Sequence, residues 1–372
     1  VVSMSVLKSK ATSLKVSRRS LLAGAAAVPL LAFGAAETAH AFGASHGLTP
    51  IDGSPWQHPE LRSIDFRFRA QGVQVFDPSV RVTLPESYDS SPDRRYPVLL
   101  LLHGGRGMFL DWSREGNVIE ATKGQDLIVV MPDGGGGSFY SNANYPLPGR
   151  EAAWETFIME RVLPYVHENF RTDPSRMAIA GLSMGGWGAL ALGQRYYGHF
   201  RSISAYSGPS DCRPGSPGGG AVRAVIWMGP VADALNGYWR TSNLPGSTWG
   251  NEVYPEIAKG YNPMENIEKY RGKRLFIRSG DGTILSTFAP LPSDQDRILD
   301  ELKRRARSFI DNFGADIQEA TVHTTNERFS NALTSAGIDH DYKFLPDRTH
   351  EWGLWKECFA EDLPGMMQSL NS

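Results

Sequence analysis

One short stretch constrains the fold of this chain more than any other: an apolar run that leads into a serine flanked by glycines. Residues 177–180 (MAIA) precede residues 181–185 (GLSMG), and a helix-forming run follows over 187–195. Glycines on both sides of a serine permit the sharp, strained turn of a nucleophile elbow, which presents the hydroxyl between a strand and a helix. An ordinary Gly-Ser turn would leave the apolar run unexplained. The stretch therefore predicts a strand, a tight turn and a helix, with Ser183 as a nucleophile.

The apolar pattern of the remaining chain is typical of an α/β protein. Segments 64–69 and 80–84 alternate apolar with charged or polar residues, which predicts two half-exposed antiparallel strands. Segments 98–102 and 127–131 are continuously apolar, as strands buried on both faces of a parallel sheet are. Further strands are predicted at 200–206, 274–278 and 342–345, and helices at 151–163, 294–312, 317–336 and 352–370. This alternation predicts a doubly wound, mostly parallel sheet with helices on both faces.

Residues 207–262 interrupt the alternation. They are rich in Gly, Pro, Ser and Trp and contain no long periodic segment, so we expect an irregular excursion over the carboxyl edge of the sheet. Long irregular loops in compact domains are usually functional. We therefore predict that this segment forms part of a substrate-binding wall.

The N-terminal residues have the features of an export signal. Five basic residues precede the apolar run 21–33, and residues 39–41 (AHA) supply the small-x-small pattern of a signal-peptidase site. Residues 17–22 (SRRSLL) fit the twin-arginine variety. A membrane anchor is the alternative, but the apolar core is short for a span. We predict a twin-arginine-type signal peptide over residues 1–41, and a single exported catalytic domain over 42–372 that is secreted or envelope-associated and has no transmembrane segment.

Charge and cysteine usage argue against several classes of partner. Loss of residues 1–41 would remove five basic residues and one acidic residue, which changes the net charge from −2 to −6. The basic run 303–307 alternates with acidic residues as a solvated helix face does, so nucleic acid is not an expected partner. The two cysteines, Cys212 and Cys358, allow at most one disulfide, and whether they pair is left open. Neither lies in a metal-spaced cluster, so no metal or cofactor is predicted.

A serine hydroxyl needs a base that is oriented by a third group. Where a nucleophile elbow is used, the chain order is serine, then acid, then histidine. His350 lies just past the last predicted strand and before the last helix, which predicts it as the base. His199, His323 and His340 occupy positions where a capping or solvated histidine is the ordinary interpretation.

Two carboxylates compete for the role of the acid. Asp281 follows the strand 274–278, a position that many hydrolases use, whereas Glu319 lies within a predicted helix, 31 residues before His350. Position relative to the strands favours Asp281.

The oxyanion hole of such enzymes requires two backbone N–H groups, one from the residue after the nucleophile and one from a loop that follows an earlier strand. Met184 supplies the first group. Residues 103–106 (HGGR) end the strand 98–102, and Gly105 can bring its amide close because it has no side chain. The alternative interpretation of this sequence is a simple tight turn. Arg106 could hold a polar group of the substrate or cap the sheet edge.

Seven short stretches together resemble a known family. They are residues 102–106 (LHGGR), 131–134 (MPDG), 138–140 (SFY), 154–157 (WETF), 181–184 (GLSM), 249–250 (WG) and 349–352 (THEW). From about residue 98 onward, the chain resembles the secreted mycolyltransferases of mycolic-acid-bearing actinobacteria, the antigen-85 type within the esterase D-like α/β hydrolases. The resemblance implies an α/β-hydrolase fold for residues 42–372.

The resemblance also implies roles for individual residues. The family's catalytic glutamate precedes an Asn-x-x-Phe element, here residues 326–329, so the resemblance selects Glu319, with Asp281 as the alternative. It further implies that Arg106 and Trp352 bind the sugar of trehalose esters and that Gly105 occupies the oxyanion-hole position. Two departures from the family's sequence pattern concern the acceptor of the acyl group. His103 replaces an acidic residue near the sugar, and segment 286–316 is longer than its counterpart.

Together these features predict an exported, serine-dependent acyltransferase or esterase. Its substrate would be an acyl sugar or another lipid ester, with trehalose mycolates among the candidates that the resemblance implies. Water as the acceptor would make the protein a carboxylesterase. A non-catalytic envelope-binding homologue is a third possibility, because fold does not determine function, but such a protein is expected to have a broken triad.

Overall fold

The computed structural model describes residues 42–282 and 295–372. The predicted signal peptide lies outside the described residues. Ten strands form one sheet, in which β1, β3, β4, β6, β5, β7, β8, β9 and β10 are neighbours in that order and β2 pairs with β3. The strands are β1 (Leu48–Pro50), β2 (Trp56–His58), β3 (Ser63–Ala70), β4 (Ser79–Thr83), β5 (Tyr96–Leu102), β6 (Ile128–Pro132), β7 (Thr172–Leu182), β8 (Ser202–Tyr206), β9 (Arg274–Gly280) and β10 (Asp341–Leu345).

The sheet is antiparallel at one end and parallel over the rest. β1, β2, β3 and β4 pair antiparallel, and β4 joins β6 antiparallel. All pairings from β6 through β5, β7, β8 and β9 to β10 are parallel. The carboxyl ends of these parallel strands therefore meet at one edge, which is where open α/β sheets bind their ligands.

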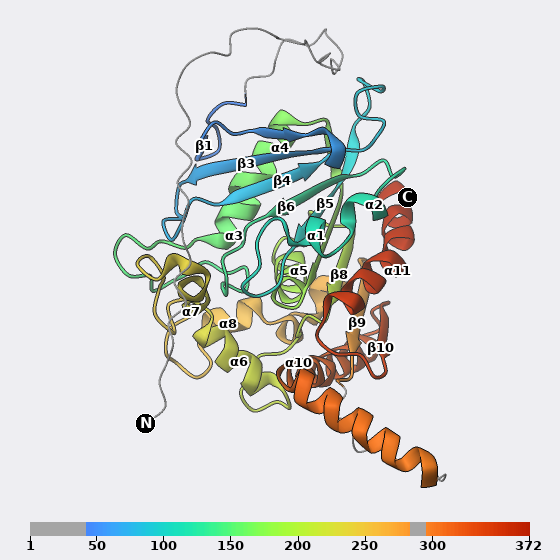
Figure 1. Cartoon of the computed structure of the whole chain (residues 1–372). Helices are drawn as coiled ribbons and strands as arrows, with labels where there is room; N and C mark the ends of the chain where they lie inside the picture. The colour runs from blue at the N-terminus through green and yellow to red at the C-terminus, as the bar shows by residue number, and fades with distance from the viewer. Residues whose placement is uncertain (1–41, 283–294) are drawn as a thin grey trace, which may run out of the picture. The chain divides into compact units, whose positions relative to one another are not determined.

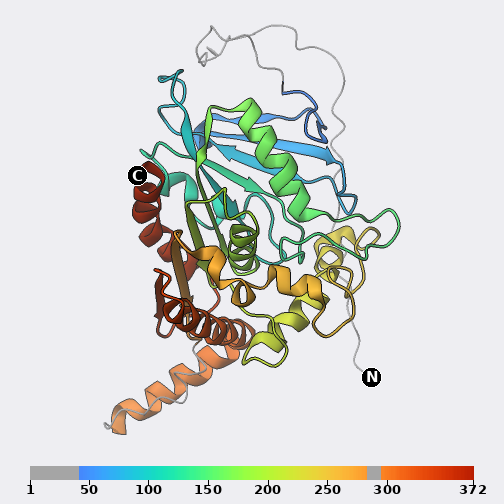
Figure 2. The same ribbon diagram turned by 180° about the vertical axis from the view of Figure 1, so that it is seen from behind.

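Both faces of the parallel part are covered, as the continuous apolar runs predict. Along β5, Val98, Leu100 and Leu102 pack into one apolar cluster, and Leu99 and Leu101 pack into the other. The first cluster is covered by α3 (Trp154–Thr156), the π-helical turn η2 (Phe157–Val162), α4 (Leu163–Asn169), α5 (Met184–Arg195) and part of α10 (Gln295–Ser335). The second is covered by α1 (Asp111–Arg114), α2 (Val118–Ala121) and α11 (Trp352–Asn371). Figure 1 shows α1 and α2 in front of the sheet, and Figure 2 shows α4 on the opposite side.

Two predictions of local structure were wrong. Separate helices were predicted at 294–312 and 317–336, but α10 is one helix, Gln295–Ser335. Gly314 lies inside it, and a single glycine lowers helix stability by only about 1 kcal/mol without breaking the hydrogen-bond ladder.

Segment 207–262 was expected to be irregular, but it contains α6 (Gly219–Met228), α7 (Val231–Asp233), the π-helical turn η3 (Ala234–Tyr238) and α8 (Glu256–Tyr261). α6 buries Val222 and Ile226, which are one helical turn apart. The glycines at its start hid this short pattern.

The two cysteines cannot form a disulfide. Cys212 lies in the apolar cluster on one face of the sheet and Cys358 in the cluster on the other, and both are free and buried. No helix of the described residues is both long and apolar enough to cross a membrane.

Candidate active site

Ser183 lies in a sharp turn between β7 and α5, at the carboxyl edge of the sheet. Its backbone has φ 53° and ψ −119°, a conformation that a non-glycine residue rarely adopts. A Cβ atom at Gly181 would lie 2.3 Å from the carbonyl oxygen of Gly185, and one at Gly185 would lie 2.5 Å from that of Leu102. Both flanking positions therefore exclude any side chain. This is the strand, elbow and helix that the GLSMG stretch predicts.

His350 and Glu319 form a hydrogen-bonded line with Ser183. The Nε2 atom of His350 lies 2.7 Å from Ser183 Oγ, and its Nδ1 atom lies 2.5 Å from Glu319 Oε2. His350 sits in the loop between β10 and α11, and Glu319 projects from α10 with no exposed surface. A buried carboxylate on Nδ1 keeps the proton there and leaves Nε2 free to accept one from the serine.

Asp281, the rival acid, lies elsewhere. Its Oδ1 atom accepts the N–H of Asp347 at 2.9 Å, in the loop that leads to His350. Partial burial raises the pKa of this carboxyl, with the nearby charge of Asp347 as a smaller contribution in the same direction. The structure thus brings Glu319, and not Asp281, to the histidine.

Three further residues complete the surroundings of Glu319, and sequence reasoning missed all of them. Ser207, directly after β8, donates its hydroxyl to Glu319 Oε1 at 2.8 Å, and the Gly280 N–H donates to the same oxygen at 2.5 Å. The indole N–H of Trp355 in turn donates to Ser207 Oγ at 2.9 Å. The Trp355 ring also lies edge-on to the His350 ring, with centroids 5.0 Å apart. Ser207 follows a buried strand and so lies at the same sheet edge as the elbow, and this position could have predicted that it belongs to the site.

Two backbone N–H groups beside Ser183 are available to a ligand. Met184 is the first residue of α5, where helical N–H groups have no intrahelical partner. In the described part of the chain, neither its N–H nor that of Gly105 has a hydrogen-bond acceptor. Both residues line the cleft with Ser183. A Cβ at Gly105 would meet no atom closer than 3.9 Å, so this glycine leaves space on the cleft side.

The turn that carries Gly105 is held from behind by α7 and η3. The Arg106 N–H donates to the Gly136 carbonyl at 2.6 Å, and the Gly136 N–H donates to Asp233 Oδ1 at 2.7 Å. Asn236 Nδ2 donates to the Arg106 carbonyl at 3.2 Å. Arg106 itself has φ 59°. Burial of Asp233, opposed by its hydrogen bond from Gly136, raises the pKa of the carboxyl to about 6. Segment 207–262 therefore supports the predicted oxyanion loop.

The cleft above Ser183 has a volume of about 610 Å³. Its lining includes both residues that the resemblance assigned to sugar binding, Arg106 and Trp352, together with Val225 and Ala232 from segment 207–262. The Arg106 side chain is exposed and has no hydrogen bond or ion pair within the described residues. Trp352 packs edge-on against Trp355, with ring centroids 5.2 Å apart.

His103 does not line the cleft. It is 1% exposed, its Nε2 atom accepts the Gly134 N–H at 2.9 Å, and its Nδ1 atom lies 2.8 Å from the Gly104 carbonyl. It therefore joins two loops behind the cleft. The longer segment 286–316, the other departure, lies partly outside the described residues. Among the described residues, no three His, Cys, Asp or Glu side chains are grouped as metal ligands would be.

Comparisons with known proteins identify the family of the chain. Residues 76–366 match the Esterase family, described as "Putative esterase", and the chain belongs to it. The fold is shared with solved structures such as MPT51 of Mycobacterium tuberculosis, with a TM-score of 0.56 at 18% identity over 79% of this chain and 94% of that one. These findings confirm the predicted α/β-hydrolase fold.

Two relatives are informative about function. Esterase Rv1288 of Mycobacterium tuberculosis is 33% identical over 287 residues, which cover 76% of this chain and 54% of that protein. The chain thus spans about half the length of this relative. The diacylglycerol acyltransferase/mycolyltransferase Ag85C of Mycobacterium avium is 29% identical over 259 residues, which cover 66% of this chain and 62% of that protein. The relatives are thus esterases and acyltransferases, and the predicted resemblance to the antigen-85 type is confirmed.

Proposed function

We propose that this chain is an exported serine-dependent acyltransferase or esterase that acts on acyl sugars or other lipid esters through an acyl-enzyme. One observation supports the proposal above all others: Ser183, His350 and Glu319 form a hydrogen-bonded line at a cleft that also presents two backbone N–H groups without partners. Nucleophile, base, orienting acid and oxyanion donors are the groups that acyl transfer requires.

In the first half-reaction, Ser183 Oγ attacks the ester carbonyl and its proton passes to His350 Nε2. The Nδ1–H of the resulting imidazolium donates to one oxygen of the Glu319 carboxylate, and the Ser207 hydroxyl and the Gly280 N–H donate to the other. The N–H groups of Gly105 and Met184 donate to the oxyanion. His350 then gives its proton to the departing alkoxide, and the acyl group remains on Ser183.

In the second half-reaction, an acceptor hydroxyl attacks the acyl carbonyl and gives its proton to His350, which returns a proton to Ser183 Oγ as the bond between the serine and the acyl group breaks. We infer that a sugar hydroxyl is the preferred acceptor, because Arg106 and Trp352 line the cleft beside Ser183 and a relative is named a mycolyltransferase. Trehalose mycolates are the candidate substrates that the resemblance to the antigen-85 type implies. A bound, oriented hydroxyl can outcompete water because effective molarities of oriented groups reach about 10⁵ M or more.

Hydrolysis is the second candidate, and one finding favours it: Rv1288, which is 33% identical to this chain, is named an esterase. Product partition separates the two functions. A lipid ester donor is supplied with and without trehalose or an arabinose-containing acceptor, and acylated sugar is quantified against free acid. Transfer predicts that acylated sugar increases with acceptor concentration. Free acid as the main product at every acceptor concentration would establish a carboxylesterase instead.

Export is a separate part of the proposal and rests on residues 1–41. Replacing Arg18 and Arg19 by lysine is expected to retain the protein inside the cell, because the twin-arginine pair is what the export receptor reads. The measurement is the distribution of the protein between cells and medium. Equal export of both forms would contradict the assignment of a twin-arginine signal.

A further inference from the structure

Segment 225–253 exposes an unusual amount of apolar surface. Fourteen large hydrophobic side chains are exposed in the described part of the chain, and eight of them fall within these 29 residues. We call six of them the apolar rim: Val225, Met228, Leu235, Tyr238, Trp239 and Leu244. Trp239 and Leu235 are each 65% exposed and Leu244 is 58% exposed. Concentrated exposed apolar surface on a soluble domain marks an interaction site.

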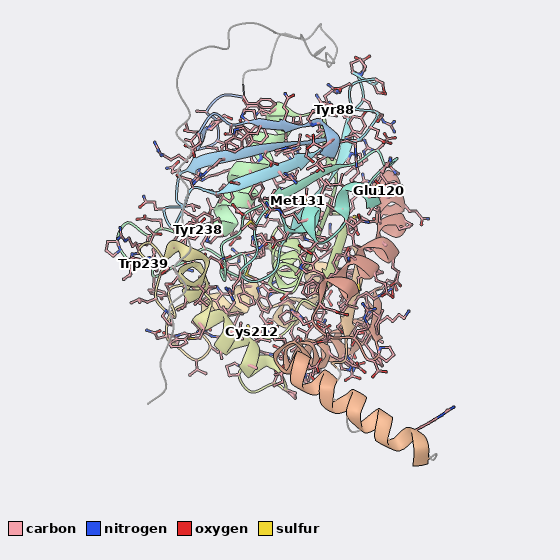
Figure 3. The ribbon with its side chains drawn as sticks, in the orientation of Figure 1. Tyr88, Glu120, Met131, Cys212, Tyr238 and Trp239 are labelled. Carbon is pink, nitrogen blue, oxygen red and sulfur yellow. The ribbon has the colours of Figure 1, made fainter. Side chains whose placement is uncertain are left out.

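The elements that carry the rim are held together. The Gly246 N–H donates to the Trp227 carbonyl at 2.8 Å, which joins the loop after Leu244 to the end of α6. The Ser242 N–H donates to the Tyr238 carbonyl at 2.8 Å. α7 follows α6 after two residues, and Figure 3 shows Trp239 at the outer edge of the molecule next to Tyr238. The rim is therefore built on folded backbone.

The charge pattern specifies what kind of surface the rim can contact. Between residues 224 and 251 the charged residues are Asp233, which is buried, and Arg240. The Arg240 guanidinium lies over the Trp239 ring, 4.8 Å from its centroid. Trp and Tyr rings with an adjacent cation are the side chains that settle at the boundary between lipid and water. A segment with so few charges of its own suits neutral lipid better than a charged protein.

The rim is also continuous with the cleft. Val225 of the rim, Gly229 and Ala232 line the cleft above Ser183, whereas Leu235 and Trp239, on the next turns of the same segment, are exposed to solvent. A long acyl chain has little tendency to enter water alone. It can pass from a lipid assembly over the rim and past Val225 and Ala232 to Ser183.

We propose that the apolar rim docks the protein onto the surface of a lipid assembly that contains its ester substrate. The inference rests on the proposed function, which supplies the chemical nature of the ester. It adds that the protein binds this ester at the surface of a lipid assembly. The occupant of the rim is the neutral, apolar boundary of the assembly, with Trp239 and Leu244 inserted among the acyl chains.

The test is co-sedimentation of the purified protein with neutral phosphatidylcholine vesicles. The test variant carries Trp239→Ser and Leu244→Ser. The matched control carries Tyr197→Ser and Phe344→Ser, which are 53% and 45% exposed on other elements. Because burying a large apolar side chain changes a partition coefficient by roughly tenfold or more, we expect the test variant to bind vesicles at least about tenfold more weakly than wild type. The control should bind as wild type does.

Hydrolysis of soluble p-nitrophenyl acetate, measured in parallel, separates the two proposals. All three proteins should turn it over equally, because none of the four positions lines the cleft. Equal vesicle binding by wild type and test variant, or equal loss in test variant and control, overturns the docking inference while the proposed function stands. If wild type does not bind vesicles but forms a dimer, and the test variant does not dimerise, the docking inference is wrong and the rim contacts a second copy of this chain. No turnover of the soluble ester by wild type refutes the proposed function, whatever the vesicles show.

Discussion

The Glu319→Gln variant tests the orienting acid most sharply, because the surroundings of this side chain determine how the amide must lie. Glu319 Oε1 accepts from two donors, the Ser207 hydroxyl and the Gly280 N–H. A glutamine must keep its carbonyl oxygen toward these donors, which turns its NH₂ group toward His350 Nδ1. Nδ1 must then accept, so the proton moves to Nε2, where it faces Ser183 Oγ. The histidine is held in the tautomer that cannot take the serine proton.

The expected loss is about 10⁴-fold in kcat, the size seen when the orienting Asp of a trypsin-type triad is replaced by Asn, and it corresponds to about 5.5 kcal/mol of transition-state stabilisation. The assay is steady-state hydrolysis of a short aryl ester, with thermal unfolding to show that the variant folds. Asp281→Asn is the matched control, because its retained carbonyl oxygen can still accept the Asp347 N–H. A kcat of Glu319→Gln within tenfold of the wild-type value, or an equal loss of kcat in Asp281→Asn, would show that Glu319 is not the orienting acid.

Three further predictions follow from the same geometry. Ser183→Ala and His350→Ala should each lower kcat by roughly 10⁶ while the protein still folds, because the two groups act as one unit; substantial esterase activity in Ser183→Ala would remove the nucleophile assignment. Ser207→Ala deletes a hydrogen bond to the Glu319 carboxylate, worth about 1.5–3 kcal/mol, so kcat should fall about tenfold to a hundredfold with KM little changed; unchanged kcat would show that Gly280 alone holds the carboxylate. Asp233 has a pKa of about 6 in the folded protein, above its ordinary value of 3.8, so its stabilising contribution is greatest below about pH 3.8 and is lost as pH rises through 6. The unfolding free energy of wild type relative to Asp233→Asn should therefore fall by about 3 kcal/mol between about pH 3 and pH 7, as measured by urea denaturation, and a constant difference would contradict the raised pKa.

Local patterns predicted much of the fold and the tight turn that carries Ser183. The elbow at Ser183 depends on glycines within two residues of it, and the alternation of buried strands with helices depends on runs of five to ten residues, so both could be predicted from neighbouring positions. His350 could be predicted because the carboxyl ends of parallel strands meet at one edge of a sheet.

Contacts between distant parts of the chain were harder to predict. Glu319 lies on a helix that approaches the end of β9 from the side, so position along the strands favoured Asp281, and only the family resemblance selected the glutamate. Ser207 and Trp355 are 148 residues apart and meet only because β8 ends and α11 begins at the same sheet edge. No periodicity indicates such a pair.

The helices of segment 207–262 were missed for a different reason. α6 begins with glycines, and its apolar side chains divide between the core and the solvent. Val222 and Ile226 face inward, whereas Val225 and Met228 are exposed, so the segment lacks the single apolar stripe that predicts a helix packed against a core.

In the proposed mechanism, Ser183 carries the acyl group between donor and acceptor. Mass spectrometry of the purified protein after brief incubation with a trehalose mycolate or a p-nitrophenyl ester tests it directly. We expect one acyl group per chain, located by fragmentation on the peptide that contains Ser183, and absent from the Ser183→Ala variant. Turnover with the acyl group on another residue, or an unchanged adduct in Ser183→Ala, would contradict it.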